Sequence, residues 1–108
     1  MKLPVDSIIA FRKVKGYLLS PQADGDKSLF LARAGYSAES AEILMEDLRR
    51  QILPLDAEYT GDSEYGKKFR IRGSLRGPNG TSLAVVTVWM TDNEFGLTKF
   101  VTLFPDKK

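Results

Sequence analysis

The apolar positions between residues 38 and 52 repeat with the period of a helix. They recur at steps of three and four residues, which places them on one helical face. Ser37 is a suitable N-cap residue directly before this segment, and Pro54 does not continue a helix beyond it. The sequence therefore predicts a helix over about 38–52. Its core face consists of Ala41, Leu44, Met45, Leu48 and Ile52.

Two shorter helical segments are expected before this helix. The stretch 8–19 is apolar with basic insertions, which predicts a short helix or an irregular turn ending near Leu19. The composition of 20–25 is typical of a loop. A further helix is predicted from about 26 to 34, with Gly35 as the residue that stops it.

The second half of the chain changes to the period of two that is typical of strands. Apolar and polar residues alternate through most of it, and clusters rich in Gly, Asn and Asp interrupt the alternation. Consecutive strands joined by short turns favour an antiparallel meander. The predicted strands cover about 55–60, 67–75, 82–90 and 97–104, with turns at 61–64, 76–80 and 92–96. The strand at 82–90 is apolar on both faces, so we expect it to be central and covered.

Together these patterns predict an α+β fold in which N-terminal helices pack on a four-stranded antiparallel β-meander. The 108 residues suit a single domain, 1–108, with a helical half over about 6–53 and a sheet half over about 55–105. No apolar run reaches the roughly 18 residues that cross a membrane. We therefore expect no membrane association and a location in the cytoplasm, or delivery into a target cytoplasm as part of a larger toxin.

The composition limits the chemistry that this chain performs. It contains no cysteine and no histidine, which excludes disulfides, thiolate metal sites, cysteine nucleophiles and the usual acid–base group near neutral pH. We expect no cofactor and no metal. Any catalysis must use Lys, Arg, Tyr, Ser, Thr or carboxylates.

The charge is small in total but unevenly distributed. The net charge is +2, yet eight acidic residues lie between Glu39 and Glu64, whereas five basic residues and no acid lie between Lys67 and Arg76. A basic surface on a nearly neutral chain still attracts phosphates locally. On the strand predicted at 67–75, the alternation places Lys68, Arg70 and Arg72 on one face.

These three cations are spaced about 6–7 Å apart by the rise of a strand. This is close to the separation of phosphates along a single nucleic-acid strand, and it indicates a phosphate-binding surface. The alternative is an ordinary solvated face, or charge that protects a sheet edge. Nearby aromatic residues, Tyr65 and Trp89, support the first interpretation.

The helical half offers a second group of candidates. Lys13 precedes Tyr17 by four residues, so a helix would place both on one face. Lys27 stands near a helix start, where the helix dipole disfavours a cation, and it therefore suggests a bound anion. The alternatives are packing for Tyr17 and simple solvation for Lys27.

Three further candidates lie on the predicted strands. Thr87 and Trp89 share one face of the central strand, and Thr102 lies midway along the last strand. A hydroxyl can orient a phosphate, and an indole can stack on a base. The alternatives are strand propensity for the threonines and core packing for Trp89.

A set of short motifs, in this order, resembles a family of small bacterial proteins known as a domain of unknown function. The set consists of Lys13 with Tyr17-Leu18-Leu19, Gly25 with Lys27, Gly35-Tyr36-Ser37, Tyr65-Gly66, Gly73 with Gly77-Pro78-Asn79-Gly80, Thr87-Val88-Trp89 and Val101-Thr102-Leu103-Phe104-Pro105. The final strand is also similar to the ends of bacterial toxin ribonucleases of the barnase, EndoU, colicin and RelE-type group. Those enzymes pack helices on a four-stranded antiparallel sheet, in agreement with the predicted fold.

The resemblance implies a metal-independent ribonuclease in which the 2′-hydroxyl of RNA is the nucleophile. Lys13 and Lys27 would stabilise charge or exchange protons, and Thr102 would orient the phosphate. The chain departs from the histidine-bearing members because it has no His. The expected substrate contacts are Tyr17, Lys68, Arg70, Arg72, Thr87 and Trp89. The expected partners are RNA and a cognate immunity or antitoxin protein. The alternative is a non-catalytic protein, itself immunity-like, antitoxin-like or an adaptor.

Overall fold

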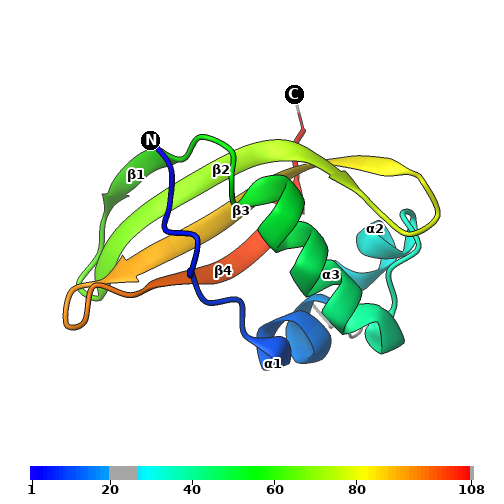
Figure 1. Cartoon of the computed structure of the whole chain (residues 1–108), viewed down its shortest axis with the longest axis horizontal. Helices are drawn as coiled ribbons and strands as arrows, with labels where there is room; N and C mark the ends of the chain where they lie inside the picture. The colour runs from blue at the N-terminus through cyan, green and yellow to red at the C-terminus, as the bar shows by residue number, and fades with distance from the viewer. Residues whose placement is uncertain (20–26, 108) are drawn as a thin grey trace.

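The computed structural model describes residues 1–19 and 27–107, and its second half is a four-stranded antiparallel sheet (Figure 1). The strand order β1-β2-β3-β4 follows the sequence, as in a meander. The strands are β1 (Glu58–Asp62), β2 (Gly66–Arg76), β3 (Ser82–Asp92) and β4 (Thr98–Pro105). The predicted topology is therefore confirmed.

Short helical segments make up the first half of the described chain. The segment α1 (Phe11–Lys13) continues directly into the π-helix η1 (Val14–Leu18), and α2 (Ser28–Ala32) follows. The predicted long helix is also present. It consists of η2 (Ala38–Ser40), α3 (Ala41–Asp47) and η3 (Leu48–Ile52), which are 3₁₀, α and π in turn. The loop predicted at 20–25, and the predicted helix start at 26, lie outside the described residues.

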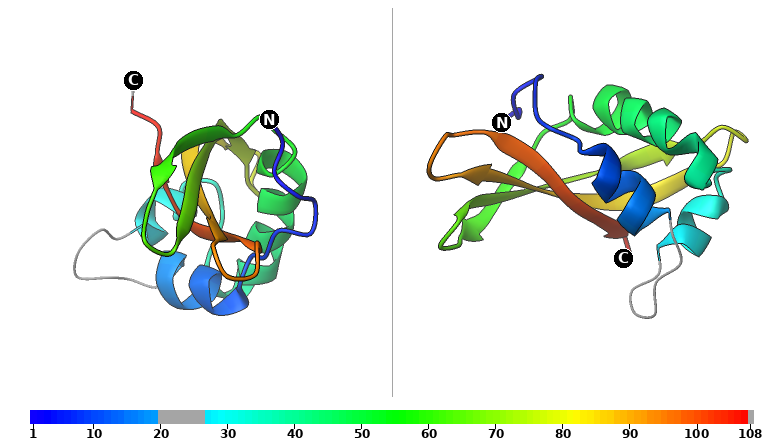
Figure 2. Two further views of the ribbon diagram at one scale, coloured as in Figure 1. Left: turned by 90° about the vertical axis from the view of Figure 1, so that its left-hand side faces the viewer. Right: turned by 90° about the horizontal axis from the view of Figure 1, so that it is seen from below.

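The helices cover one face of the sheet and leave the other uncovered (Figure 2). The alternation of β2 follows this arrangement, since Phe69, Ile71 and Leu75 are buried whereas Lys68 and Arg72 are exposed. The expectation that β3 is covered on both faces is only half correct. On the uncovered side, Val88 and Met90 remain partly exposed, because no element packs over them there.

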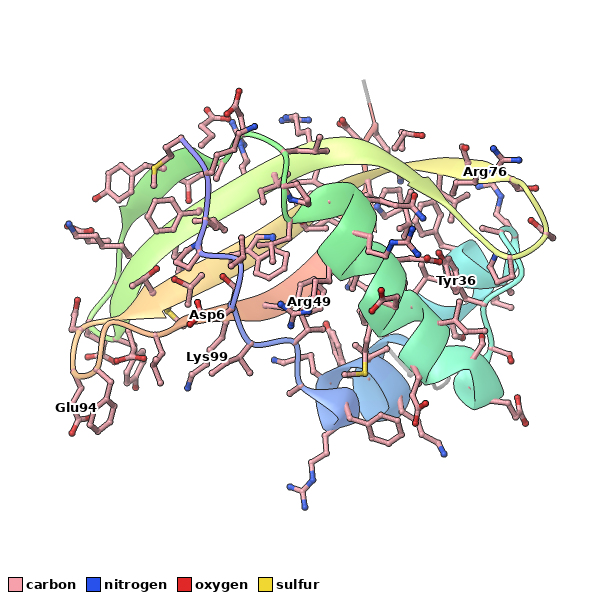
Figure 3. All side chains as sticks on the ribbon, in the orientation of Figure 1. Asp6, Tyr36, Arg49, Arg76, Glu94 and Lys99 are labelled. Atoms are coloured by element: carbon pink, nitrogen blue, oxygen red, sulfur yellow. The ribbon has the colours of Figure 1, made fainter. Side chains whose placement is uncertain are left out.

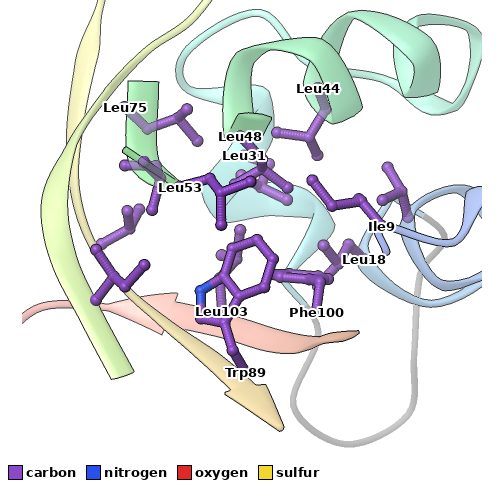
Figure 4. Packing of buried hydrophobic residues seen from close by; sticks show 14 of the residues in the cluster. Ile9, Leu18, Leu31, Leu44, Leu48, Leu53, Leu75, Trp89, Phe100 and Leu103 are labelled. Carbon is purple, nitrogen blue, oxygen red and sulfur yellow. The ribbon is translucent and has the colours of Figure 1, made fainter. Parts of the chain in front are cut away.

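Trp89 of β3 stands at the centre of the core (Figure 4). Its side chain is fully buried, and its ring meets that of Phe100 edge-on at a centroid distance of 5.3 Å. The indole N–H donates a hydrogen bond to the Thr87 hydroxyl (2.8 Å), which in turn donates to the carbonyl of Ile71 (3.0 Å). The polar atoms of this pair are therefore satisfied inside an apolar core.

Both boundaries of β1 differ from the prediction, and those of the other strands differ by at most two residues. The first strand starts at Glu58 rather than near residue 55, because the Leu55 N–H donates to the Ile52 carbonyl and closes a turn after the helix. Gly61 and Asp62 belong to β1 rather than to the following turn. A bulge between Tyr59 and Gly61 lets β1 extend to this point, an irregularity that alternation alone does not reveal.

The turn between β2 and β3 packs against the end of α2. The backbone N–H of Asn79 donates to the Ala34 carbonyl (3.2 Å), and its side-chain amide donates to the Arg33 carbonyl (3.1 Å). Gly35 adopts a positive φ of 94°, which ends the helix as predicted. A side chain at Gly77 would meet the Ala34 carbonyl oxygen at 2.1 Å. The glycine-rich turn is thus a cap for the helix as well as a hairpin.

The segment between α2 and η2 is held from the opposite side by Tyr36. Its buried hydroxyl donates to Asp47 (2.6 Å) and lies 3.3 Å from the carbonyl of Arg76. Burial and the bond to the carboxylate raise the pKa of Tyr36 well above its ordinary value. Figure 3 shows Tyr36 between the helices and the turn that carries Arg76. This contact joins the two halves of the chain.

The N-terminal segment lies along the edge of β4. Ile8 forms a parallel bridge with Lys99, in which the Ile8 N–H donates to Thr98 and the Ile8 carbonyl accepts from Phe100, both at 2.8 Å. Arg49 holds the same segment by donating to two of its carbonyl oxygens (Figure 3). Across the described parts of the chain, each helix is too short or too polar to span a bilayer.

Replacement of Gly77 by alanine is expected to destabilise the protein by about 1–3 kcal/mol, because the added Cβ collides with a backbone carbonyl. Urea denaturation followed by circular dichroism measures the change. Gly16→Ala is the matched control, since a Cβ there meets nothing within 4 Å and alanine favours a helix. Equal stabilities of the two variants would contradict the close approach at Gly77.

Candidate functional site

The segment α1–η1 presents Lys13 and Tyr17 on its outer side. Val14 and Leu18 are fully buried in the core and fix the orientation of this segment. The remaining face therefore points away from the core, and Lys13 and Tyr17, four residues apart, share it. The ammonium nitrogen of Lys13 lies 5.9 Å from the centre of the Tyr17 ring. The predicted juxtaposition of these two residues is confirmed.

Lys27 reaches the same tyrosine from a different element. Its carbonyl accepts the N–H of Leu31, so it stands at the start of α2, as predicted. Its Nζ donates to the Tyr17 hydroxyl at 3.4 Å and lies 5.4 Å from the ring centre. Tyr17 is 38% exposed, so this arrangement is open to solvent. Two cations thus flank one accessible phenol.

Thr102 completes the cluster from β4. The strand is irregular here, because Val88 pairs with Thr102 whereas Trp89 pairs with Phe100, and Val101 is left as the bulged residue. The partly exposed Thr102 points to the uncovered side of the sheet, opposite to the buried Leu103. Its hydroxyl donates to the Leu103 carbonyl (3.4 Å), and Thr102 also acts on the Tyr17 phenol by lowering its pKa.

The surroundings of Tyr17 favour its anionic form. Hydrogen bonding to Thr102 is the largest cause of a lowered pKa, and hydrogen bonding and charge from Lys27 come next. Partial burial opposes this shift, and the charge of Lys13, the smallest of these causes, adds to it. Four residues that were separate candidates in the sequence are therefore one electrostatic unit: Lys13, Tyr17, Lys27 and Thr102.

Lys68, Arg70 and Arg72 of β2, here called the basic strand, were predicted to bind phosphates. In the structure, carboxylates from neighbouring segments pair with two of these three cations. Arg70 binds Glu58 of β1 through two hydrogen bonds of 2.9 and 3.0 Å. These hydrogen bonds, and next the charge of Arg70, lower the pKa of Glu58. Arg72 donates to Asp106 at 2.6 Å. Sequence reasoning missed both acids, because Glu58 and Asp106 lie 12 and 34 positions away from their partners.

The strand register relates this basic strand to the cluster around Tyr17. Arg70, Val88 and Thr102 are paired across three neighbouring strands and therefore share one face. Two strand spacings separate Arg70 from Thr102, or about 10 Å. Lys68 is exposed on the same face. A single extended ligand can thus reach both the basic strand and the cluster.

The structure corrects the expectation that Thr87 and Trp89 contact a substrate. Both side chains are completely buried, and each is hydrogen-bonded inside the core. They have no surface that another molecule could touch. Their contribution is structural, since they shape the sheet beneath the helices.

Within residues 1–19 and 27–107, no three carboxylates gather closely enough to hold a metal ion. The described part of the candidate site consists of cations and hydroxyls, which suit anions rather than metals.

Comparisons with known proteins agree with this fold. Residues 4–107 match the family model described as Domain of unknown function (DUF6883). Among solved structures, a contact-dependent growth inhibition toxin–immunity protein complex from Klebsiella pneumoniae 342 contains a similar chain, with a TM-score of 0.62 and 19% identity over 93% of this chain and 100% of that chain. At this identity the similarity concerns the fold. A search of curated proteins gave no match.

The two arginine–carboxylate pairs should differ in their contribution to stability. The Asp106 side chain is only 6% exposed, so Arg72→Met leaves a buried carboxylate without its partner and should cost about 1–3 kcal/mol. The Arg70–Glu58 pair is 38% and 59% exposed, and Arg70→Met should cost less than about 1 kcal/mol. Urea denaturation of both variants tests this order, and a larger loss for the Arg70 variant would reverse it.

Proposed function

The chain belongs to the DUF6883 family, and we propose that it is a metal-independent ribonuclease of a bacterial toxin system. The observation that supports this function best is the cluster of Lys13, Tyr17, Lys27 and Thr102 at the edge of the sheet. Cations and hydroxyls gathered at one accessible point suit a phosphodiester that gains negative charge during cleavage. The fold shared with a chain of a toxin–immunity complex supports the same proposal.

RNA brings its own nucleophile, so the protein needs only to position the strand, move protons and stabilise charge. In this proposal the 2′-oxygen attacks the adjacent phosphorus, and the bond to the 5′-oxygen breaks. Lys13 and Lys27 stabilise the charge that develops on the phosphoryl oxygens, and the Thr102 hydroxyl orients the phosphate. Lys68 and the paired Arg70 and Arg72 would contact phosphates further along the strand.

The test is cleavage of single-stranded RNA by the purified protein in the presence of EDTA. We expect products that end in a 2′,3′-cyclic phosphate, and growth arrest when the protein is expressed in bacteria. Lys27→Gln should lower the cleavage rate about 100-fold or more, because it removes a cation that touches the reacting groups. Lys67→Gln is the matched control, since this exposed lysine lies at the far end of β2 and should not change the rate. No RNA cleavage and no growth defect would reject the proposal.

A second candidate function, binding of a partner protein, is favoured by the uncovered face of the sheet. The cations of Arg70 and Arg72 are already neutralised by carboxylates of the same chain. Between them and the edge lies a hollow of about 300 Å³ lined in part by Val86, Phe104 and Pro105, and Phe104 is 42% exposed. Apolar surface between internally paired charges suits a protein better than a polyanion.

If this face binds a cognate immunity or antitoxin protein, Phe104→Glu should weaken the complex at least tenfold by placing a charge in the hollow. The probe is the protein encoded beside this gene, and the measurement is isothermal titration calorimetry. Phe95→Glu is the control, because Phe95 is more exposed but lies in the turn after β3, away from this hollow. Equal affinities of the two variants would exclude the face as the binding site.

A further inference from the structure

The phenol of Tyr17 occupies the central position in the candidate site. Lys27 from the start of α2, Lys13 from α1 and Thr102 from β4 all act on it. Because Tyr17 is 38% exposed, its oxygen is also within reach of a ligand. A substrate bound at this site would meet the phenol and the Lys27 ammonium side by side, 3.4 Å apart.

From this geometry, and resting on the proposed ribonuclease function, we propose that Tyr17 accepts the proton of the attacking 2′-hydroxyl and that Lys27 donates the proton to the leaving 5′-oxygen. Lys13 and Thr102 are then not proton carriers. Besides the contacts with phosphate proposed above, they favour negative charge on the Tyr17 oxygen, Lys13 through its charge and Thr102 through its hydroxyl. This assignment replaces the role of substrate contact that the sequence suggested for Tyr17.

The charges around the Tyr17 phenol give the physical reason for this assignment. A phenol that faces two ammonium groups and a hydroxyl donor is stabilised as the phenolate. The Lys27 ammonium, 3.4 Å from the phenol oxygen, places an N–H donor beside it. The lowered pKa of Tyr17 agrees with this arrangement. The site thus contains a base and an acid of opposite charge, whereas two lysines alone would supply two acids.

The step balances without any other reactant. The 2′-oxygen forms a bond to phosphorus while its proton passes to the Tyr17 oxygen, and the bond between phosphorus and the 5′-oxygen breaks while that oxygen takes a proton from Lys27. The products are a 2′,3′-cyclic phosphate and a 5′-hydroxyl. Tyr17 is now a neutral phenol and Lys27 a neutral amine. Transfer of the phenol proton across their hydrogen bond restores both groups.

Substitutions distinguish the residues that transfer protons from those that contribute only charge. Tyr17→Phe should lower cleavage at least 100-fold and remove the rise of the rate with pH that accompanies deprotonation of the phenol. Lys27→Arg keeps the cation but does not release a proton, so it should lose at least 100-fold as well. Lys13→Arg, which keeps the cation, should retain more activity than Lys13→Gln, because Lys13 contributes charge and no proton. Tyr59→Phe, which removes an exposed hydroxyl bonded to Asp62, is the control.

A second readout does not depend on cleavage. The difference in ultraviolet phenolate absorbance between the wild type and Tyr17→Phe reports the titration of Tyr17 itself. Tyr17 should titrate below an ordinary tyrosine in the wild type and in Lys27→Arg, and closer to the ordinary value in Lys27→Gln. In a cleaving protein, full activity of Tyr17→Phe or of Lys27→Arg would overturn the assignment. If the wild type does not cleave RNA, the ribonuclease itself is rejected, and the titration still shows whether Tyr17 and Lys27 are coupled.

Discussion

The burial of Trp89 is the constraint on which the rest of the structure depends. An indole N–H in an apolar core must find an acceptor, and the Thr87 hydroxyl supplies one at 2.8 Å while it bonds to Ile71 of the next strand. The helices that pack over the indole remove its apolar surface from water. Val14 of η1, Leu31 of α2 and Leu48 of η3 are buried in the same cluster. The helices that carry Lys13, Tyr17 and Lys27 are therefore placed by the core.

Much of the fold could be predicted from the sequence, because its elements depend on local pattern. The helix over 38–52, the alternation of β2 and the turn at 76–80 follow from periodicity and from Gly, Pro and Asn. The start of β1 and the bulge at Val101 could not be predicted, since they depend on neighbouring strands and on the turn after the helix. Burial of Trp89 was foreseen only as the alternative to a binding role, because periodicity does not show which face of β3 the helices cover.

The residues of the candidate site could be predicted from the sequence, but most of the contacts among them could not. Lys13, Tyr17, Lys27 and Thr102 were each identifiable as candidates, and only Lys13 and Tyr17 are close enough in sequence for helical spacing to join them. The convergence of three elements on one phenol depends on tertiary packing. The same limit explains why the sequence does not reveal the partners of Arg70 and Arg72, which Glu58 and Asp106 neutralise in the folded chain. A run of like charge in one strand says little about the charge of the face.

The large separation between Tyr17 and Thr102 determines when the site comes into existence. They are 85 positions apart in the sequence, and the N-terminal segment is fixed to β4 by the bridge from Ile8 to Lys99. A ribosome that adds roughly 5–20 residues per second exposes Tyr17 several seconds before it makes Thr102. Until the last strand has paired, the phenol lacks a neighbour that holds its charge. During synthesis the unfinished chain therefore lacks the complete cluster of Lys13, Tyr17, Lys27 and Thr102 until β4 has been made and has paired.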